Sequence, residues 1–212
     1  MSKPENSFSD ILEAIRFIAL NVKIYGIFKG RLSENYDDNR FLAFFSKDFL
    51  RARQWSIIPL WEGDLRVLQK NDRTKIYFLN EIRDFCLRNN DGFMYVAALE
   101  KNKWEYSIGF ESLVVAARKL DLSVDDPNDL FKVTPNNLPY WGNNFMWPSS
   151  ERFVVYTEGD NCSFIAGDRR EIEDLIGLSY SYCRGRFISA VAAHGAELDF
   201  VDAYAKFCDE FV

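Results

Sequence analysis

Two short apolar runs and a well-marked helix start, all within residues 152–177, constrain the fold of this chain most strongly. The runs RFVVYT and CSFIAG are separated by a Glu-Gly-Asp-Asn sequence at residues 158–161, which is typical of a tight turn between paired strands. Asp168 then stands where a helix N-cap is expected, Glu171 follows three residues later, and Gly177 marks the C-terminal stop. The segment therefore predicts an antiparallel hairpin that leads directly into a short helix.

The rest of the chain alternates between clusters of short β-type runs and segments with helical spacing. The runs SIIPLW, LRVLQ and TKIYFL predict a three-strand meander, and FMYVAAL and WEYSIGF predict a second hairpin. Pro59 has no backbone N–H to donate, so the first strand of the meander is expected at a sheet edge or bulge. Helical spacing predicts helices over residues 9–28, 40–53, 80–89, 111–120 and 185–194, and a final helix towards the C-terminus.

Strands that come in clusters, with helices between the clusters, predict an α+β fold rather than a doubly wound α/β fold. The expected architecture is a mainly antiparallel sheet built from a meander and hairpins, packed by about six helices. At 212 residues and 48% hydrophobic content, the chain can bury a sizeable core. We expect a single domain over residues 1–212, with the acidic connector at residues 121–132 as its weakest boundary.

Residues 133–150, with the sequence VTPNNLPYWGNNFMWPSS, contain no charged side chain. Three prolines and two Asn-Asn pairs predict a loop. The loop nevertheless carries Tyr140, Trp141, Phe145 and Trp147, which a free loop would not keep in water. Two interpretations stay open: an exposed aromatic surface that recognises a partner, or rings that fold back and complete the core over the sheet.

The acidic residues are concentrated in the second half of the chain. Residues 1–106 contain 17 Lys and Arg against 15 Asp and Glu, whereas residues 107–212 contain 9 against 17, a net charge of −8. An acidic half disfavours nucleic acid or an anionic membrane as the main partner, and it suits a basic protein. The arginines at 51 and 53, 169 and 170, and 184 and 186 form pairs rather than a patch, so we expect them to serve in ion pairs.

Several classes of function lack their sequence signals. The four cysteines have no C-x-x-C spacing, so we expect buried, reduced thiols rather than disulfides or a metal site. The start MSKPENSFSD has no apolar core of a signal peptide, and no run approaches about 18 apolar residues, so a cytoplasmic protein is expected. Phosphate-binding glycine motifs are absent. We expect no metal, no cofactor, and no role for nucleic acid or membrane.

Acid–base chemistry has few candidates in this sequence. The single histidine, His194, precedes Gly195 near a predicted helix end, where capping or packing explains it. Glu111 and Glu158 are nominal members of a carboxylate pair, but their spacing along the chain does not place them at a required separation. No catalytic residue is assigned.

The sequence favours a non-enzymatic protein-binding function: an acidic inhibitor, similar in class to bacterial immunity proteins, that occludes a basic and possibly toxic protein partner. The alternative is a hydrolase that uses paired carboxylates in a cleft beside the aromatic loop at residues 139–148, and a third possibility is a scaffold subunit. The last predicted helix is amphipathic, with its acidic residues outward. The residues expected to bind the partner are Tyr140, Trp141, Phe145, Trp147, Asp199, Asp202, Asp209 and Glu210.

Overall fold

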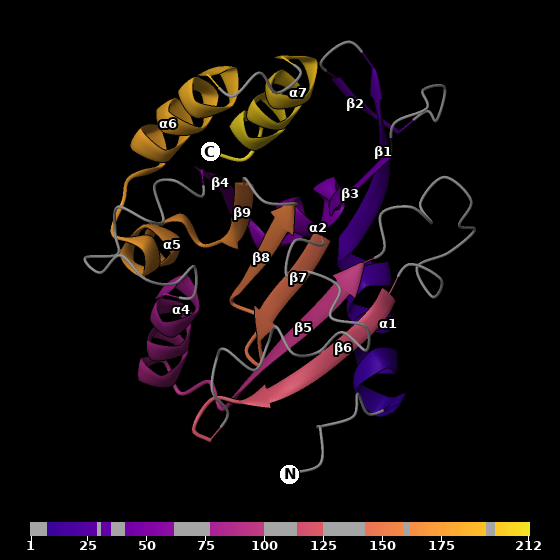
Figure 1. Cartoon of the computed structure of the whole chain (residues 1–212), viewed down its shortest axis with the longest axis vertical. Helices are drawn as coiled ribbons and strands as arrows, with labels where there is room; N and C mark the ends of the chain where they lie inside the picture. Colours follow the sequence, from indigo (N-terminus) through magenta and orange to yellow (C-terminus); the bar gives the residue numbers. More distant parts are fainter. Residues whose placement is uncertain are drawn as a thin grey trace.

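A computed structural model describes residues 8–28, 31–34, 41–61, 77–99, 114–124, 143–158, 162–193 and 198–212. Its helices are α1 (Phe8–Asn21), α2 (Lys47–Arg53), α4 (Tyr77–Arg88), α5 (Arg169–Ile176), α6 (Tyr180–Ala193) and α7 (Leu198–Asp209). Its strands are β1 (Val22–Phe28), β2 (Arg31–Ser33), β3 (Phe41–Phe45), β4 (Ser56–Trp61), β5 (Phe93–Leu99), β6 (Val114–Asp121), β7 (Asn143–Pro148), β8 (Phe153–Glu158) and β9 (Cys162–Gly167). Figure 1 shows their arrangement.

The strands form two antiparallel sheets, which confirms the α+β class. The larger sheet has the order β4-β9-β8-β7-β5-β6, and the smaller has the order β2-β1-β3. The predicted hairpin is β8 and β9, in register from Phe153 opposite Gly167. The Asp168 carboxylate caps α5 by accepting the N–H groups of Arg170 and Glu171, and Gly177 ends the helix in the left-handed conformation.

The edge strand β4 of the larger sheet is covered by a helix. Pro59 lies in this strand, as its missing N–H predicts. Helix α6 packs along β4 and has buried residues on both sides of the sheet edge: Cys183 belongs to one core cluster and Phe187 to the other. The covering helix removes a site at which another strand would pair.

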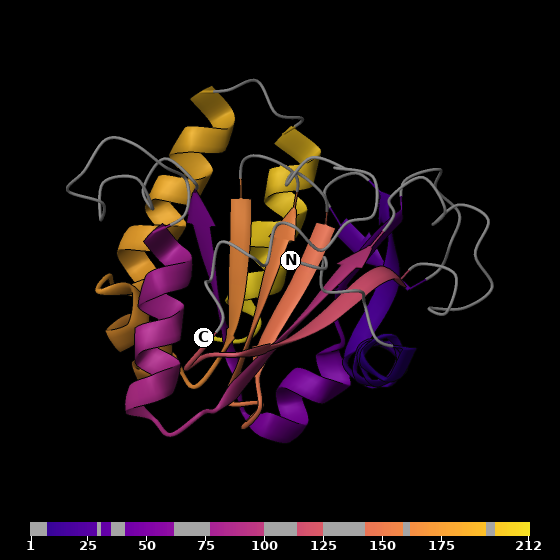
Figure 2. The same ribbon diagram turned by 60° about the horizontal axis from the view of Figure 1, so that its bottom comes forward.

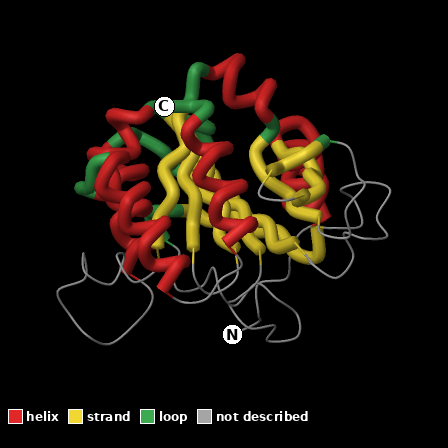
Figure 3. Tube along the Cα trace, turned by 90° about the horizontal axis from the view of Figure 1, so that it is seen from above, coloured by secondary structure: helices red, strands yellow, loops and turns green. Residues whose placement is uncertain are grey.

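The larger sheet is packed on both faces over most of its area, and it is exposed at the end of β5 and β6 that carries Phe93 and Lys119. One face packs against α1, α2, α7 and the small sheet, and the other packs against α4 and α5. Figure 2 and Figure 3 show the helices on both sides of the strands. Because both faces of these strands are covered, β4 and β9 are buried at every position, and the alternation of a half-exposed strand is missing.

Two segments predicted to be entirely helical each contain a strand. The first helix ends at Asn21 rather than at residue 28, and the chain continues as β1; the segment 40–53 divides into β3 and α2. One pairing explains both errors, because β1 and β3 pair with each other from Val22 opposite Phe45 to Gly26 opposite Phe41. This contact between distant segments overrides the helical spacing of each.

The predicted helix at residues 111–120 is also wrong, because residues 114–121 form strand β6. Its adjacent alanines, Ala116 and Ala117, have the composition of a helix, yet both are buried in a strand with neighbours on each face. Ala117 pairs with Ala97 of β5, and α1 packs over this part of the sheet. Two small side chains opposite each other leave room for the helix to approach closely.

The loop expected at residues 133–150 is partly a strand: residues 143–148 form β7, between β5 and β8. Of the meander, only SIIPLW is seen as a strand, since residues 65–69 lie outside the described part of the chain and residues 77–79 open α4. The expected second strand of the 93–110 hairpin, residues 104–110, also lies outside the description.

Candidate partner-binding surface

Helix α7 presents the acidic residues that the sequence singled out. Its inner side is fixed by aromatic packing, since the ring of Phe44 meets Tyr204 at 4.9 Å and Phe207 at 5.0 Å between centroids. The side chains of Asp202, Asp209 and Glu210, at the helix and just after it, are 49%, 38% and 43% exposed. They lie outward as the amphipathic pattern predicts. Asp199 also belongs to α7, but its side chain lies outside the description.

Asp209 binds two side chains of α6. The Arg184 guanidinium donates to both carboxylate oxygens at 2.6 Å, and the Tyr180 hydroxyl donates to Oδ1 at 2.7 Å. The hydrogen bond from Arg184 lowers the pKa of Asp209 below its usual range, and the bond from Tyr180 adds to this. Burial, and then the bond to Asp209, raise the pKa of Tyr180. The contact therefore ties α7 to α6.

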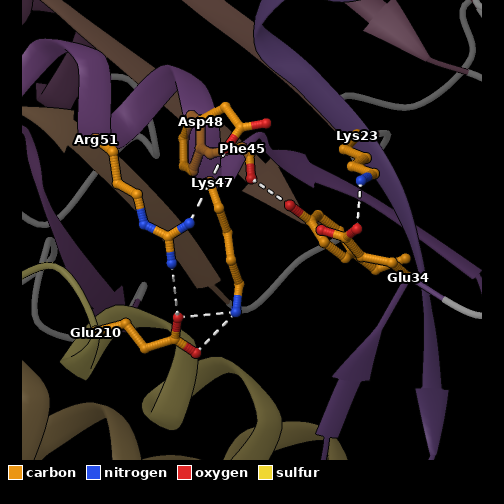
Figure 4. A network of polar contacts seen from close by, with 8 residues as sticks. Lys23, Glu34, Phe45, Lys47, Asp48, Arg51 and Glu210 are labelled. Carbon is orange, nitrogen blue, oxygen red and sulfur yellow. Dashed lines mark hydrogen bonds and ion pairs between the residues drawn. The ribbon is translucent and has the colours of Figure 1, made fainter.

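Glu210 is bound from the other side, by α2. Both carboxylate oxygens accept from Lys47 Nζ at 2.8 Å, and Arg51 lies 4.0 Å away (Figure 4). Lys47 Nζ also lies 5.3 Å from the centre of the Phe207 ring. Asp202 has a partner within its own helix, since it accepts from Lys206 at 2.5 Å. Each of these three carboxylates thus has a basic partner from the same chain, which compensates its charge locally.

The aromatic residues of the uncharged run divide into two groups. Tyr140 and Trp141 lie outside the described residues. Phe145 and Trp147 are on β7 and buried in the core, with 0% and 2% of their surface exposed. In this structure they offer no surface to a partner, because alternate positions of β7 face the core packed under α1 and the small sheet.

The hydrolase alternative requires paired carboxylates. In the described part of the chain one acid is buried, Asp91. Its Oδ1 accepts from Ser150 N at 2.9 Å and from Ser149 Oγ at 3.2 Å, and Arg152 Nε lies 3.5 Å from Oδ2. These bonds fix the end of α4 to the turn between β7 and β8. We therefore read Asp91 as a structural residue. Glu111 lies outside the described residues, as does the side chain of Glu158.

The structure brings together a set of residues that the sequence reading did not single out. Phe93 and Tyr95 of β5 share a sheet face with Lys119 and Asp121 of β6, because Tyr95 is opposite Lys119 and Phe93 is opposite Asp121. The first helix brings two more acids to this place. We call the group the Phe93 patch; it consists of Phe93, Tyr95, Lys119, Asp121, Asp10 and Glu13. The alternation in FMYVAAL placed Phe93 and Tyr95 on one face, but the pairing with β6 had no sequence signal.

Among the described residues, no group of three or more His, Cys, Asp and Glu side chains is placed to hold a metal ion. His194 lies outside the description. All four cysteines are buried free thiols. No helix in the described ranges is long and apolar enough to cross a membrane.

Comparison of the chain with protein-family models, with curated proteins and with solved structures found no match.

Proposed function

We propose that this chain is a non-enzymatic protein that binds a basic protein partner and occludes it, in the manner of an immunity protein or antitoxin. The observation that carries the proposal is the charge distribution: the second half has 17 acidic and 9 basic residues. A surplus of this kind attracts a basic protein and raises its association rate.

The ion pairs of α7 refine how the acidic residues would act. Carboxylates that already have basic partners contribute less to long-range steering than unpaired ones. They are, however, held in fixed positions and remain 38–49% exposed. A carboxylate has about four acceptor sites, so Asp209 and Glu210 can accept further N–H groups from a partner without releasing Arg184 or Lys47.

The test is direct binding to a defined basic protein, and the product of the reading frame immediately upstream is the first partner to try. Its association rate would be measured by stopped flow at low and high salt, beside an acidic protein of similar size. We expect fast binding of the basic protein that slows steeply with salt, because exposed charges more than about 10 Å apart are screened at 0.1 M.

Two variants locate the contribution of α7. Asp202→Asn and Glu210→Gln together should slow association, whereas Asp84→Asn and Asp174→Asn together, which remove two exposed acids on α4 and α5, serve as the matched control. A panel of basic proteins that all fail to bind, or that bind with no dependence on salt, would contradict the proposed function.

A further inference from the structure

We propose that the partner contacts the Phe93 patch in addition to the α7 face, and that an arginine side chain of the basic partner takes the place now held by the Lys119 ammonium over the Phe93 and Tyr95 rings. This inference rests on the proposed function and names the surface and the chemistry that it would use.

The patch already holds a cation in the geometry that a partner's cation would need. Lys119 Nζ lies 4.3 Å from the centre of the Phe93 ring and 5.3 Å from that of Tyr95. Both distances are within the range of about 6 Å over which a ring face attracts a cation. The Tyr95 hydroxyl is hydrogen-bonded to the side chains of Lys119 and Glu13. The patch thus combines two aromatic faces, a phenol and a carboxylate around one ammonium group.

The charges of the patch favour cations beyond the one present. Asp10, Glu13 and Asp121 bring three carboxylates to the place that holds the Lys119 ammonium, and the Asp121 carboxylate is positioned by hydrogen bonds from the N–H and the hydroxyl of Ser123. Asp10 Oδ2 lies 3.3 Å from the backbone N of Lys119 and accepts its N–H, so this acid is fixed beside the strand. The hydrogen bond with Tyr95, with smaller contributions from Glu13 and Asp10, raises the pKa of Lys119. The surroundings therefore stabilise positive charge at this place.

One wall of the patch is rigid and the occupant is not. Tyr95 stacks on Trp147 at 5.6 Å, and Trp147 stacks on Phe17 of α1 at 4.0 Å, so the Tyr95 ring is backed by the core. Phe93 is 39% exposed, and Lys119 is an exposed residue on a flexible four-carbon stem. The lysine can leave the rings without unfolding any element, whereas the Tyr95 ring is held by the core.

Arginine is the cation that fits such a surface best. Its planar guanidinium stacks on aromatic faces and can donate two N–H bonds to one carboxylate, and it is less strongly hydrated than an ammonium group. It is also enriched at protein interfaces. An arginine lying on Phe93 would have Asp121 directly across the strand pair, so charge and shape both favour this occupant.

The experiment uses the full chain and a fluorescent peptide of alternating arginine and glycine, with a glutamate–glycine peptide as the negative probe, followed by anisotropy at low salt. Lys119→Met removes the ammonium that occupies the rings and should tighten binding at least about threefold, because Lys119 no longer competes with the peptide for the two rings. Arg170→Met, which removes an exposed positive charge on α5, is its matched control. Comparison of the two variants distinguishes an effect of uncovering the rings from an effect of removing one positive charge.

Phe93→Ala should weaken binding about fivefold, the loss expected from one exposed cation–π contact. Its control is Leu87→Ala, because Leu87 on α4 is equally exposed, at 39%. If the wild type binds but Lys119→Met and Phe93→Ala behave like their controls, the proposed function stands and this surface is not the docking site. If neither the wild type nor Lys119→Met binds the arginine peptide, the patch is not an arginine site; the proposed function itself is contradicted only if the basic proteins also fail to bind.

Discussion

Replacing Trp147 with alanine tests how firmly α1 is attached to the sheet. The indole is 2% exposed and stacks on Phe17 of α1, with ring centroids 4.0 Å apart and planes 4° apart. It also stacks on Tyr95, its neighbour across the strand pair. A buried Trp removes about 200–250 Å² from water, which at about 25 cal/mol per Å² corresponds to roughly 5–6 kcal/mol. This figure is an upper bound because the unfolded chain already buries part of that area.

We therefore expect Trp147→Ala to lower the free energy of unfolding by about 3–5 kcal/mol. Urea unfolding followed by far-UV circular dichroism measures this without relying on the fluorophore that is removed. Phe93→Ala, an exposed ring on the neighbouring strand, is the control and should cost less than about 1 kcal/mol. A double-mutant cycle with Phe17→Ala isolates the stack, whose coupling should be about 0.5–1.5 kcal/mol.

A loss below about 1.5 kcal/mol for Trp147→Ala, with an unchanged denaturant slope, would refute the reasoning, because a ring that leaves no cavity is not part of the core. A coupling energy near zero would contradict only the role of the stack. It would show that burial, and not the stack with Phe17, holds the helix on the sheet.

Three further predictions concern a carboxylate, two glycines and a thiol. Asp209→Asn should cost about 0.5–1 kcal/mol at pH 7, because Arg184 loses its ionised partner in a half-exposed ion pair. Since the folded-state pKa of Asp209 is lowered, this stabilisation is fully present above the unfolded pKa of about 3.9 and is lost as the pH falls through the lower folded-state pKa. Melts of variant and wild type should therefore begin to converge only below about pH 4. Gly167→Ala should lower the free energy of unfolding by about 1–3 kcal/mol, because an added Cβ would lie 3.0 Å from atoms of Arg152 and Phe153. Gly185→Ala should raise it by about 0.4–1 kcal/mol, because its Cβ would meet open space in α6. Equal effects of the two substitutions in thermal melts would contradict this. Burial raises the pKa of the Cys86 thiol to about 12, so maleimide should label it only on unfolding, and fast labelling of the native protein would show that the site opens.

Features encoded by neighbouring residues were the predictable part of this fold. Asp168 and Gly177 lie within a few residues of the groups that they cap, so the start and end of α5 could be read directly. The β8–β9 hairpin has the same local character. By contrast, β1 became a strand only because β3 pairs with it, and a helical pattern in either segment carries no record of that contact.

The candidate site shows the same division. The outward position of Asp209 and Glu210 follows from the period of α7, but their partners Arg184 and Lys47 are 25 and 163 residues away in the chain. The sequence therefore predicted an acidic face, and the structure shows ion pairs there. The Phe93 patch was beyond reach for the same reason, since it needs β5, β6 and α1 to be placed together.

The pairing of β4 with β9 has a consequence for how the chain is made. Ser56 is opposite Gly167 and Trp61 is opposite Cys162. The chain between them is about a hundred residues long, and at about 5–20 residues per second the ribosome needs roughly 5–20 s to supply it.

During that interval the segment SIIPLW emerges from the ribosome before strand β9 and helix α6 have been synthesised. In the finished protein these two elements bury all six of its residues. An unpaired apolar strand is a site for association with other nascent chains. We therefore expect ribosome-bound chains that end before β9 to be bound by chaperones, and release to follow once residues 162–193 have emerged.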